Sequence, residues 1–162
     1  MVKSENKSDA IGILGGTFDP VHFGHLRSAL EVCQQLSLNH VRLIPCAVPP
    51  HRQATMASAE VRRLMLELAV KSVEQLIVDD RELQRDGPSF TVDTLLSLRE
   101  ELPHTPLFLI LGTDAFRGLA SWSRWQQILP LAHIVVVQRP EETLDLPGDL
   151  PNSSAHNLAQ AA

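Results

Sequence analysis

The sequence of 162 residues has two cysteines, no long apolar run and fewer basic than acidic side chains. Cys33 and Cys46 have neither CxxC spacing nor a neighbouring cysteine–histidine array, which indicates free thiols in a reducing compartment. The longest apolar runs, 107–111 and 134–137, are far shorter than the roughly 20 residues of a membrane-spanning helix. The N-terminus is polar, with no apolar run after its lysines, and predicts no signal peptide. We therefore expect a cytoplasmic protein without a membrane partner.

The balance of charge narrows the classes of partner. The chain has 14 Lys and Arg against 19 Asp and Glu, a formal net charge of −5. Proteins that coat nucleic acid need many basic side chains near the phosphates, so we expect no nucleic-acid partner. A small phosphorylated ligand stays compatible with this charge, because it needs only a few local donors. The length predicts a single domain, at roughly 150 residues per domain.

Short apolar runs alternate with amphipathic stretches along the chain. We expect strands at 11–14, 41–44, 76–78, 107–111 and 134–137. Helices are expected from Leu26, after an N-cap at Ser58, after an N-cap at Thr91 and, briefly, over 125–129. The strands lack polar alternation and are separated by helices. This pattern predicts an α/β fold with a doubly wound parallel sheet of about five strands.

The spacing of apolar residues also predicts which face each helix buries. Three sets repeat at helical intervals. They are Leu26, Ala29, Leu30, Cys33 and Leu36 in the first helix, Val61, Leu64, Met65, Leu68 and Ala69 in the second, and Val92, Leu95 and Leu96 in the third.

The segment GGTFDPVHFGH, residues 15–25, lies between the first strand and the first helix. In an open parallel sheet this turn is at the carboxyl ends of the strands, where ligands bind. Gly15 and Gly16 allow a ligand to approach the backbone, and Gly24 leaves room between His22 and His25. Both imidazoles lie near a helix N-terminus, which suits phosphates. The residue types leave three interpretations open: a nucleotide site, a turn with two surface histidines, and a zinc pair.

This segment resembles the signature of the HxGH nucleotidyltransferases. The rest of the chain resembles one family within them, the bacterial nicotinate mononucleotide adenylyltransferases. The similar segments are VPPHR at 48–52, RELQRDGPSFTVDTL at 81–95 with Phe90 where Tyr is usual, LGTD at 111–114 followed by SW at 121–122, and AHIVVVQRP at 132–140. The resemblance implies a Rossmann-like nucleotidyltransferase domain over 10–140. A polar extension over 1–9 would precede it, and an irregular or partly disordered tail over 141–162 would follow it.

The resemblance implies transfer of an adenylyl group from ATP to nicotinate mononucleotide, which yields nicotinate adenine dinucleotide and pyrophosphate. The nucleophile is already an anionic phosphate, so positioning and charge stabilisation suffice for catalysis. Mg²⁺ is expected on the substrate phosphates, held mainly by them and by water. The residues implied are His22 and His25 for catalysis, Gly15, Gly16, Thr17, Phe18, Gly112 and Asp114 for ATP, and Arg52, Thr91 and Trp122 for the mononucleotide.

Four of these residues also have a plainer interpretation. Arg52 can make a bidentate contact with a phosphate, or it can be a solvated loop arginine. Asp114 can accept ribose hydroxyls or cap a helix. Trp122 can stack on a pyridine ring or anchor the core. Thr91 can donate to the nicotinate carboxylate and cap its helix as well.

In the family that this sequence resembles, the chain continues after these segments with a further strand and a helix. That helix begins at an ISxTxIR motif, which holds the ATP phosphates. The sequence up to Ala162 has no such motif. We therefore expect a C-terminally truncated domain that binds ATP weakly and turns over little. Self-association into a homo-oligomer could cover its exposed apolar surface. Two alternatives are another HxGH adenylyltransferase, such as that for phosphopantetheine, and a catalytically silent nucleotide-binding module.

Overall fold

Five apolar segments pair side by side as one parallel sheet in the computed structural model, which describes residues 9–50 and 54–138. The strand order is β3-β2-β1-β4-β5, so β1 lies in the middle between β2 and β4. The predicted doubly wound parallel sheet is confirmed. The strands are β1 (Ile11–Gly16), β2 (His40–Pro45), β3 (Leu76–Val78), β4 (Leu107–Gly112) and β5 (His133–Val137).

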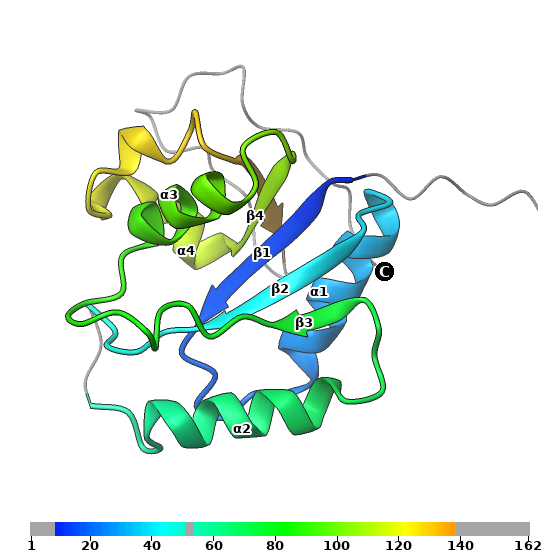
Figure 1. Cartoon of the computed structure of the whole chain (residues 1–162), viewed down its shortest axis with the longest axis vertical. Coiled ribbons are helices and arrows are strands. Elements are labelled where there is room, and N and C mark those ends of the chain that lie inside the picture. Colours follow the sequence, from blue (N-terminus) through cyan, green and yellow to red (C-terminus); the bar gives the residue numbers. More distant parts are fainter. Residues whose placement is uncertain (1–8, 51–53, 139–162) are drawn as a thin grey trace, which may run out of the picture.

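Helices cover both faces of the sheet (Figure 1). On one face α1 (Phe23–Gln35) and α2 (Ala59–Val70) bury Ala29, Val32 and Leu66 against the strands. On the other face lie α3 (Thr91–Glu101), α4 (Thr113–Arg117) and the 3-10 turns Leu119–Ser121 and Trp125–Gln127. Among the helices of these described ranges, none has the length and apolar character needed to span a membrane.

The element boundaries follow the predictions closely, with one wrong cap. Ser58 caps α2, since its hydroxyl accepts the backbone N–H of Val61 at 3.3 Å. Thr91 does not cap α3: it is the first helical residue, and Phe90 has the extended backbone of the N-cap. The helix expected over 125–129 is a single 3-10 turn.

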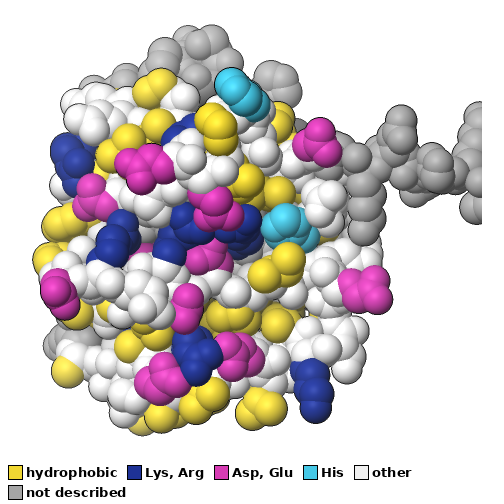
Figure 2. Space-filling view, viewed as in Figure 1, with side chains coloured by type: hydrophobic (Ala, Val, Ile, Leu, Met, Phe, Trp, Pro, Cys, Tyr) yellow, Lys and Arg dark blue, Asp and Glu magenta, His cyan; other side chains and the backbone are white. Residues whose placement is uncertain are grey.

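The buried face predicted for α2 is wrong. The expected stripe is largely in solvent, with Val61 47%, Leu64 44% and Leu68 74% exposed. Figure 2 shows apolar side chains along the lower edge of the molecule, over α2. The helix instead buries Arg62, Leu66 and Val70, because the Arg62 side chain hydrogen-bonds to backbone inside the protein.

On the other face, α3 buries Val92 and Leu95 as predicted. Leu96 was expected to face inward, but it is 39% exposed. It is adjacent to Leu95, and neighbouring helical residues point about 100° apart, so the two cannot share one narrow face.

A network of four charged side chains joins the C-terminus of α3 to the edge of the sheet. Arg42 on β2 donates to Asp79 at 3.0 Å and to Glu101 at 2.8 Å. Arg81 donates to Asp79 at 2.9 Å and to Glu101 at 2.6 Å. Hydrogen bonds from Arg42 and Arg81 lower the pKa of Glu101 to about 2. Burial alone would raise the pKa of Asp79, but the hydrogen bonds from Arg81 and Arg42 outweigh it and lower it.

The network predicts a pH-dependent contribution to stability. Because the folded-state pKa of Glu101 lies below its ordinary value, its stabilisation is complete above about pH 4.5. It disappears as the pH falls towards 2. Glu101→Gln should therefore lower the free energy of unfolding at pH 7, by a difference that shrinks between pH 4.5 and 2. Urea unfolding of both proteins across that range measures it. Glu100→Gln, at the exposed neighbour, is the control, and a difference independent of pH would contradict the assignment.

Candidate functional site

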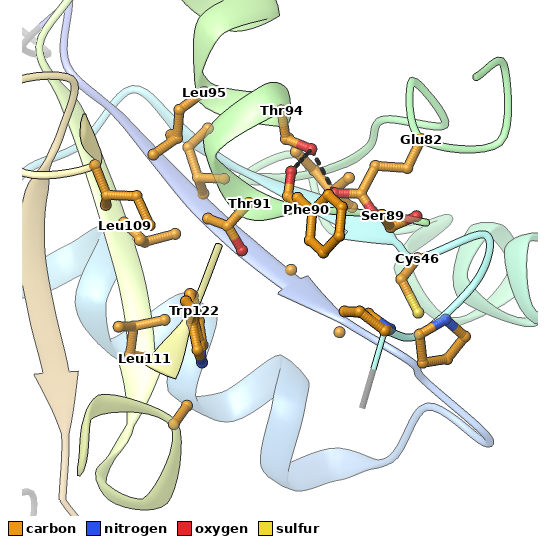
Figure 3. Close-up of a pocket in the computed structure, with 18 of the residues that line it drawn as sticks. Cys46, Glu82, Ser89, Phe90, Thr91, Thr94, Leu95, Leu109, Leu111 and Trp122 are labelled. Carbon is orange, nitrogen blue, oxygen red and sulfur yellow. Dashed lines mark hydrogen bonds between the residues drawn. The ribbon is translucent and has the colours of Figure 1, made fainter. Parts of the chain in front are cut away.

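A cavity of about 420 Å³ opens where β1, β2 and β4 end (Figure 3). Its floor is apolar, and its polar groups come from the loops after the strands and from the start of α3. Six of the predicted site residues line it, namely Gly15, Gly16, Thr17, Thr91, Asp114 and Trp122. Phe18, His22, His25 and Gly112 are described but are not among its lining residues, and Arg52 lies outside the described residues.

The two histidines stack on each other at the N-terminus of α1. Their ring centroids are 3.7 Å apart and their planes differ by 27°. His22 is the N-cap, and its backbone N–H donates to Nδ1 of His25 at 3.2 Å. An Nδ1 that accepts a hydrogen bond carries no proton, so the neutral His25 ring has its proton on Nε2. The His25 ring lies in the first turn of α1, and anions bind favourably at a helix N-terminus.

Gly24 makes room for this stack. A Cβ at Gly24 would lie 3.0 Å from both Cε1 and Nδ1 of His22. Real Cβ atoms rarely come so close to a neighbour, so a side chain at Gly24 would push the His22 ring aside. The close packing between glycine and imidazole agrees with the space that the sequence spacing predicted for Gly24.

Phe18 packs against the ring of His25. Its side chain is buried and meets the His25 ring edge-on, at 5.0 Å between centroids and an interplanar angle of 73°. A Cβ at Gly16 would lie 3.2 Å from the Phe18 ring. The buried Phe18 side chain therefore leaves only backbone to contact a ligand at this position.

Trp122 and Thr91 face the same part of the cavity from opposite elements. Figure 3 shows the indole beside Leu111, with the Thr91 side chain near it. Trp122 follows the 3-10 turn after α4, and it is half-buried against the apolar cluster under α3. Nearby, Arg124 donates to Asp93 in the first turn of α3 at 2.6 Å. This ion pair holds the tryptophan segment against the helix that carries Thr91.

At β4 the predicted residues are exposed. Asp114 lines the cavity rim with its side chain 81% exposed, and it pairs with Arg117 at 3.4 Å. It lies in the first turn of α4, whose N-cap is Gly112. A Cβ at Gly112 would meet nothing within 4 Å, so the backbone there is open to an approaching group.

Sequence reasoning missed a buried carboxyl group at one end of the cavity. Glu82 accepts from the Thr94 hydroxyl at 2.5 Å and from Ser89. Ser89 in turn accepts the backbone N–H of Ala47 at 3.0 Å and donates its own N–H to Val48. These bonds fasten the loop after β2 to the start of α3. Glu82, Ser89 and Thr94 all lie within segment 81–95, but their spacing in the sequence does not indicate a polar cluster.

Burial shifts the pKa of two groups in this region. It raises the pKa of the Glu82 carboxyl, although hydrogen bonds from Thr94 and Ser89 act in the opposite direction. It also raises the pKa of the Cys46 thiol, against the effects of Thr17 and of the Arg62 charge. Cys46 lines the cavity with its thiol 3.9 Å from the Thr17 hydroxyl. A raised pKa keeps this thiol protonated and weakly nucleophilic.

The described part of the chain has no group of three or more His, Cys, Asp and Glu side chains that could hold a metal ion. The zinc pair, one of the three interpretations that the residue types left open, therefore gains no further ligands from these residues. The arrangement offers instead an apolar slot with an aromatic wall, hydroxyl donors and a histidine pair at a helix N-terminus. Such a site suits a planar ring attached to phosphorylated groups.

Comparison with known proteins gives matches along most of the chain. The family model described as cytidylyltransferase-like matches residues 13–160. A Pseudomonas entomophila protein named "Probable nicotinate-nucleotide adenylyltransferase" is 56% identical over 143 residues, which are 88% of this chain and 65% of that protein. A protein of the same name from Aeromonas hydrophila is 49% identical over 150 residues, 93% of this chain and 70% of that protein. The chain thus spans 65% of the length of the first of these relatives.

A solved structure shares the fold. Plasmodium falciparum nicotinic acid mononucleotide adenylyltransferase complexed with NaAD superposes with a TM-score of 0.75. The alignment covers 84% of this chain and 67% of that chain at 18% identity. At 18% identity this similarity shows a shared fold and nothing about activity.

The contact between Gly24 and His22 predicts the effect of one added methyl group. Gly24→Ala should displace the His22 ring and disturb its stack on His25, which shifts the ring signals of both histidines in NMR spectra. Gly118→Ala is the matched control, because a Cβ there meets its nearest atoms at 3.6 and 3.7 Å, an ordinary contact. Unchanged histidine signals in Gly24→Ala would show that the ring is not confined as the structure has it.

Proposed function

The chain belongs to the cytidylyltransferase-like family and, within it, to the nicotinate-nucleotide adenylyltransferases, and from this premise we propose that it transfers an adenylyl group from ATP to nicotinate mononucleotide. The observation that carries the proposal is the meeting of three separate motifs at one cavity. Its lining takes residues from segments 15–17, 89–91 and 114–122. The proposed domain, over 10–140, holds all of these motifs.

The mononucleotide is proposed to enter the apolar end of the cavity. Trp122 would stack on the pyridine ring, a contact that is typically worth ~1–3 kcal/mol for a nucleic-acid base. The Thr91 hydroxyl, near the indole, would donate to the nicotinate carboxylate (Figure 3). Arg52 would contact the phosphate of the mononucleotide. This orientation points the 5′-phosphate towards the turn that follows β1.

ATP is proposed to bind across the turn after β1 and the end of β4. Gly15, Gly16, Thr17 and the Phe18 backbone would face its phosphates, while Gly112 and Asp114 would meet the nucleoside. An oxygen of the mononucleotide phosphate then attacks the α-phosphorus of ATP. A phosphoanhydride bond forms, and the bond to the β-phosphate breaks to release pyrophosphate. The stacked His22 and His25 would donate to the triphosphate while negative charge moves to this leaving group.

Mg²⁺ is proposed as the cofactor, and it would partly neutralise the triphosphate. The described residues supply no cage for it, so its ligands would be phosphate oxygens and water. The chain's own contribution would be positioning: a slot for the pyridine ring and donors at the N-terminus of α1 for the phosphates. The nucleophile needs no strong base, because a phosphate is anionic at neutral pH.

A direct assay tests the proposal. The chain is mixed with ATP, Mg²⁺ and nicotinate mononucleotide, and both nicotinate adenine dinucleotide and pyrophosphate are measured. Phosphopantetheine, as the alternative acceptor, is assayed in parallel. A version extended by the C-terminal segment of a relative is included, because the relatives are longer. The proposal is overturned if neither version forms the dinucleotide, or if phosphopantetheine is the better acceptor.

His25→Ala should reduce kcat by about 10²–10³-fold, the usual effect of removing one donor to a transition state. The reason is that the His25 ring would donate from Nε2 to the triphosphate, since its Nδ1 accepts the backbone N–H of His22. KM values should change much less than kcat. His104→Ala is the control, since this exposed histidine lies before β4, at the opposite end of that strand from the cavity. An undiminished kcat in His25→Ala would exclude the proposed role.

Trp122→Ala should raise KM for the mononucleotide about tenfold or more and leave KM for ATP nearly unchanged. The physical reason is the loss of a flat stacking surface at the pyridine end alone. Trp125→Ala is the matched control, because this second tryptophan is not among the cavity-lining residues. Steady-state titration of each substrate decides, and a defect confined to ATP would place Trp122 in the other subsite.

A further inference from the structure

A fully buried arginine lies where three segments meet beside the cavity. The guanidinium of Arg62 donates from Nη1 to the Thr17 carbonyl at 2.6 Å and from Nη2 to those of Cys46 at 2.8 Å and Ala47 at 3.3 Å. Its Nε donates to the Ala57 carbonyl at 3.3 Å. Within the described ranges, the ion pairs do not include Arg62.

This arrangement is unusual for a buried charge. Arginine stays protonated in proteins, and burial of a cation is unfavourable unless partners compensate for the lost water. Here neutral carbonyl oxygens compensate by hydrogen bonding, so the positive charge itself is not cancelled by a carboxylate in direct contact. An apolar side chain of similar volume would pack at this position without that penalty.

The carbonyl bonds fix the orientation of the peptides beside the cavity. In a trans peptide the C=O and N–H groups point in opposite directions. Because Arg62 draws in the carbonyls of Thr17 and Cys46, the N–H groups of Phe18 and Ala47 point away from it. The N–H of Ala47 does so by donating to Ser89, which lines the cavity together with Thr17 and Cys46. The loops after β1 and β2 thus keep these carbonyl oxygens turned from the ligand side.

We propose that Arg62 is a positioning residue for the phosphate subsite of this cavity. It holds the loops after β1 and β2 with their carbonyl oxygens turned inward, and its charge lies beneath the place where substrate phosphates bind. The inference rests on the proposed function, because it takes the ligand to be a nucleotide. Arg62 touches no ligand itself, and it acts through the backbone of the turn at Thr17.

The test separates the phosphate from the rest of the ligand. Dissociation constants are measured for nicotinate mononucleotide and for nicotinate riboside, which lacks only the phosphate. The affinity ratio, Kd of the riboside divided by Kd of the mononucleotide, states how much the phosphate strengthens binding, and it is compared between variants. In Arg62→Met the ratio should fall about tenfold or more, since both the charge and the carbonyl bonds are lost. Arg62→Lys keeps the charge, but one ammonium cannot span three segments, so a fall of about threefold is expected.

Arg99→Met is the matched control. The Arg99 guanidinium also donates to backbone carbonyls, those of Leu131, Leu102 and Thr105, but Arg99 is not among the cavity-lining residues. This variant should lower the thermal midpoint and leave the affinity ratio unchanged. A merely structural role of Arg62 would give the same pattern in Arg62→Met.

The outcomes are distinct. If the wild-type chain binds neither ligand, the proposed function fails and the inference fails with it. If the wild type binds the mononucleotide and Arg62→Met weakens both ligands equally, the inference alone is overturned. If Arg62→Met does not fold, Arg62→Lys decides: a reduced ratio supports the role of Arg62, and an unchanged ratio overturns it.

Discussion

The pairing of β1 with a parallel strand on each side is the constraint on which the rest of the structure depends. Gly12 on β1 shows how closely side chains of the two neighbouring strands pack over it, since a Cβ would lie 2.8 Å from Cγ2 of Val41 on β2 and 3.2 Å from Ile110 on β4. Because β2, β1 and β4 run in the same direction, their carboxyl ends share one edge. The chain leaves β1 for α1 on one face of the sheet and leaves β4 for α4 on the other face, which creates a crevice between β1 and β4. The cavity lies in that crevice, and the three motifs meet there for this reason.

The strands could be predicted because buried parallel strands have few ways to appear in a sequence. Each is a short apolar run bounded by glycine, proline or polar residues, and all five lie within two residues of their expected limits. The buried side of α2 could not be predicted in the same way. Hydrophobic periodicity assumes that apolar side chains face inward, and here four carbonyl bonds turn Arg62 inward instead. The hydrogen bonds of Arg62 therefore decide which side of α2 faces inward, although Val61, Leu64 and Leu68 remain exposed to solvent as a result.

In the site, too, contacts between residues close in sequence could be predicted, whereas contacts between distant residues could not. The space at Gly24 and the placement of His22 and His25 involve residues within three positions, so the spacing alone anticipated them. The bond from Thr94 to Glu82 spans 12 residues, and the bond from Arg62 to Thr17 spans 45. Neither sequence separation matches a helical or strand repeat, so no periodic pattern in the sequence indicates these two contacts. Such pairs are fixed only by the sheet order, which brings the loops after β1 and β2 beside α2 and α3.

The net charge of −5 also gives a poor description of the cavity. Several acidic side chains are already paired with arginines: Asp79 and Glu101 with Arg42 and Arg81, Asp93 with Arg124. Among the groups beside the cavity, the charge of Arg62 meets only carbonyl oxygens, whereas Glu82 is held by hydroxyl groups at the other side of the β2 loop. Interaction with an anion depends on such nearby charges, because distant surface charges are screened within about 10 Å at ordinary ionic strength. An acidic protein can therefore present a local environment that favours phosphate, while its surface as a whole disfavours a nucleic-acid backbone.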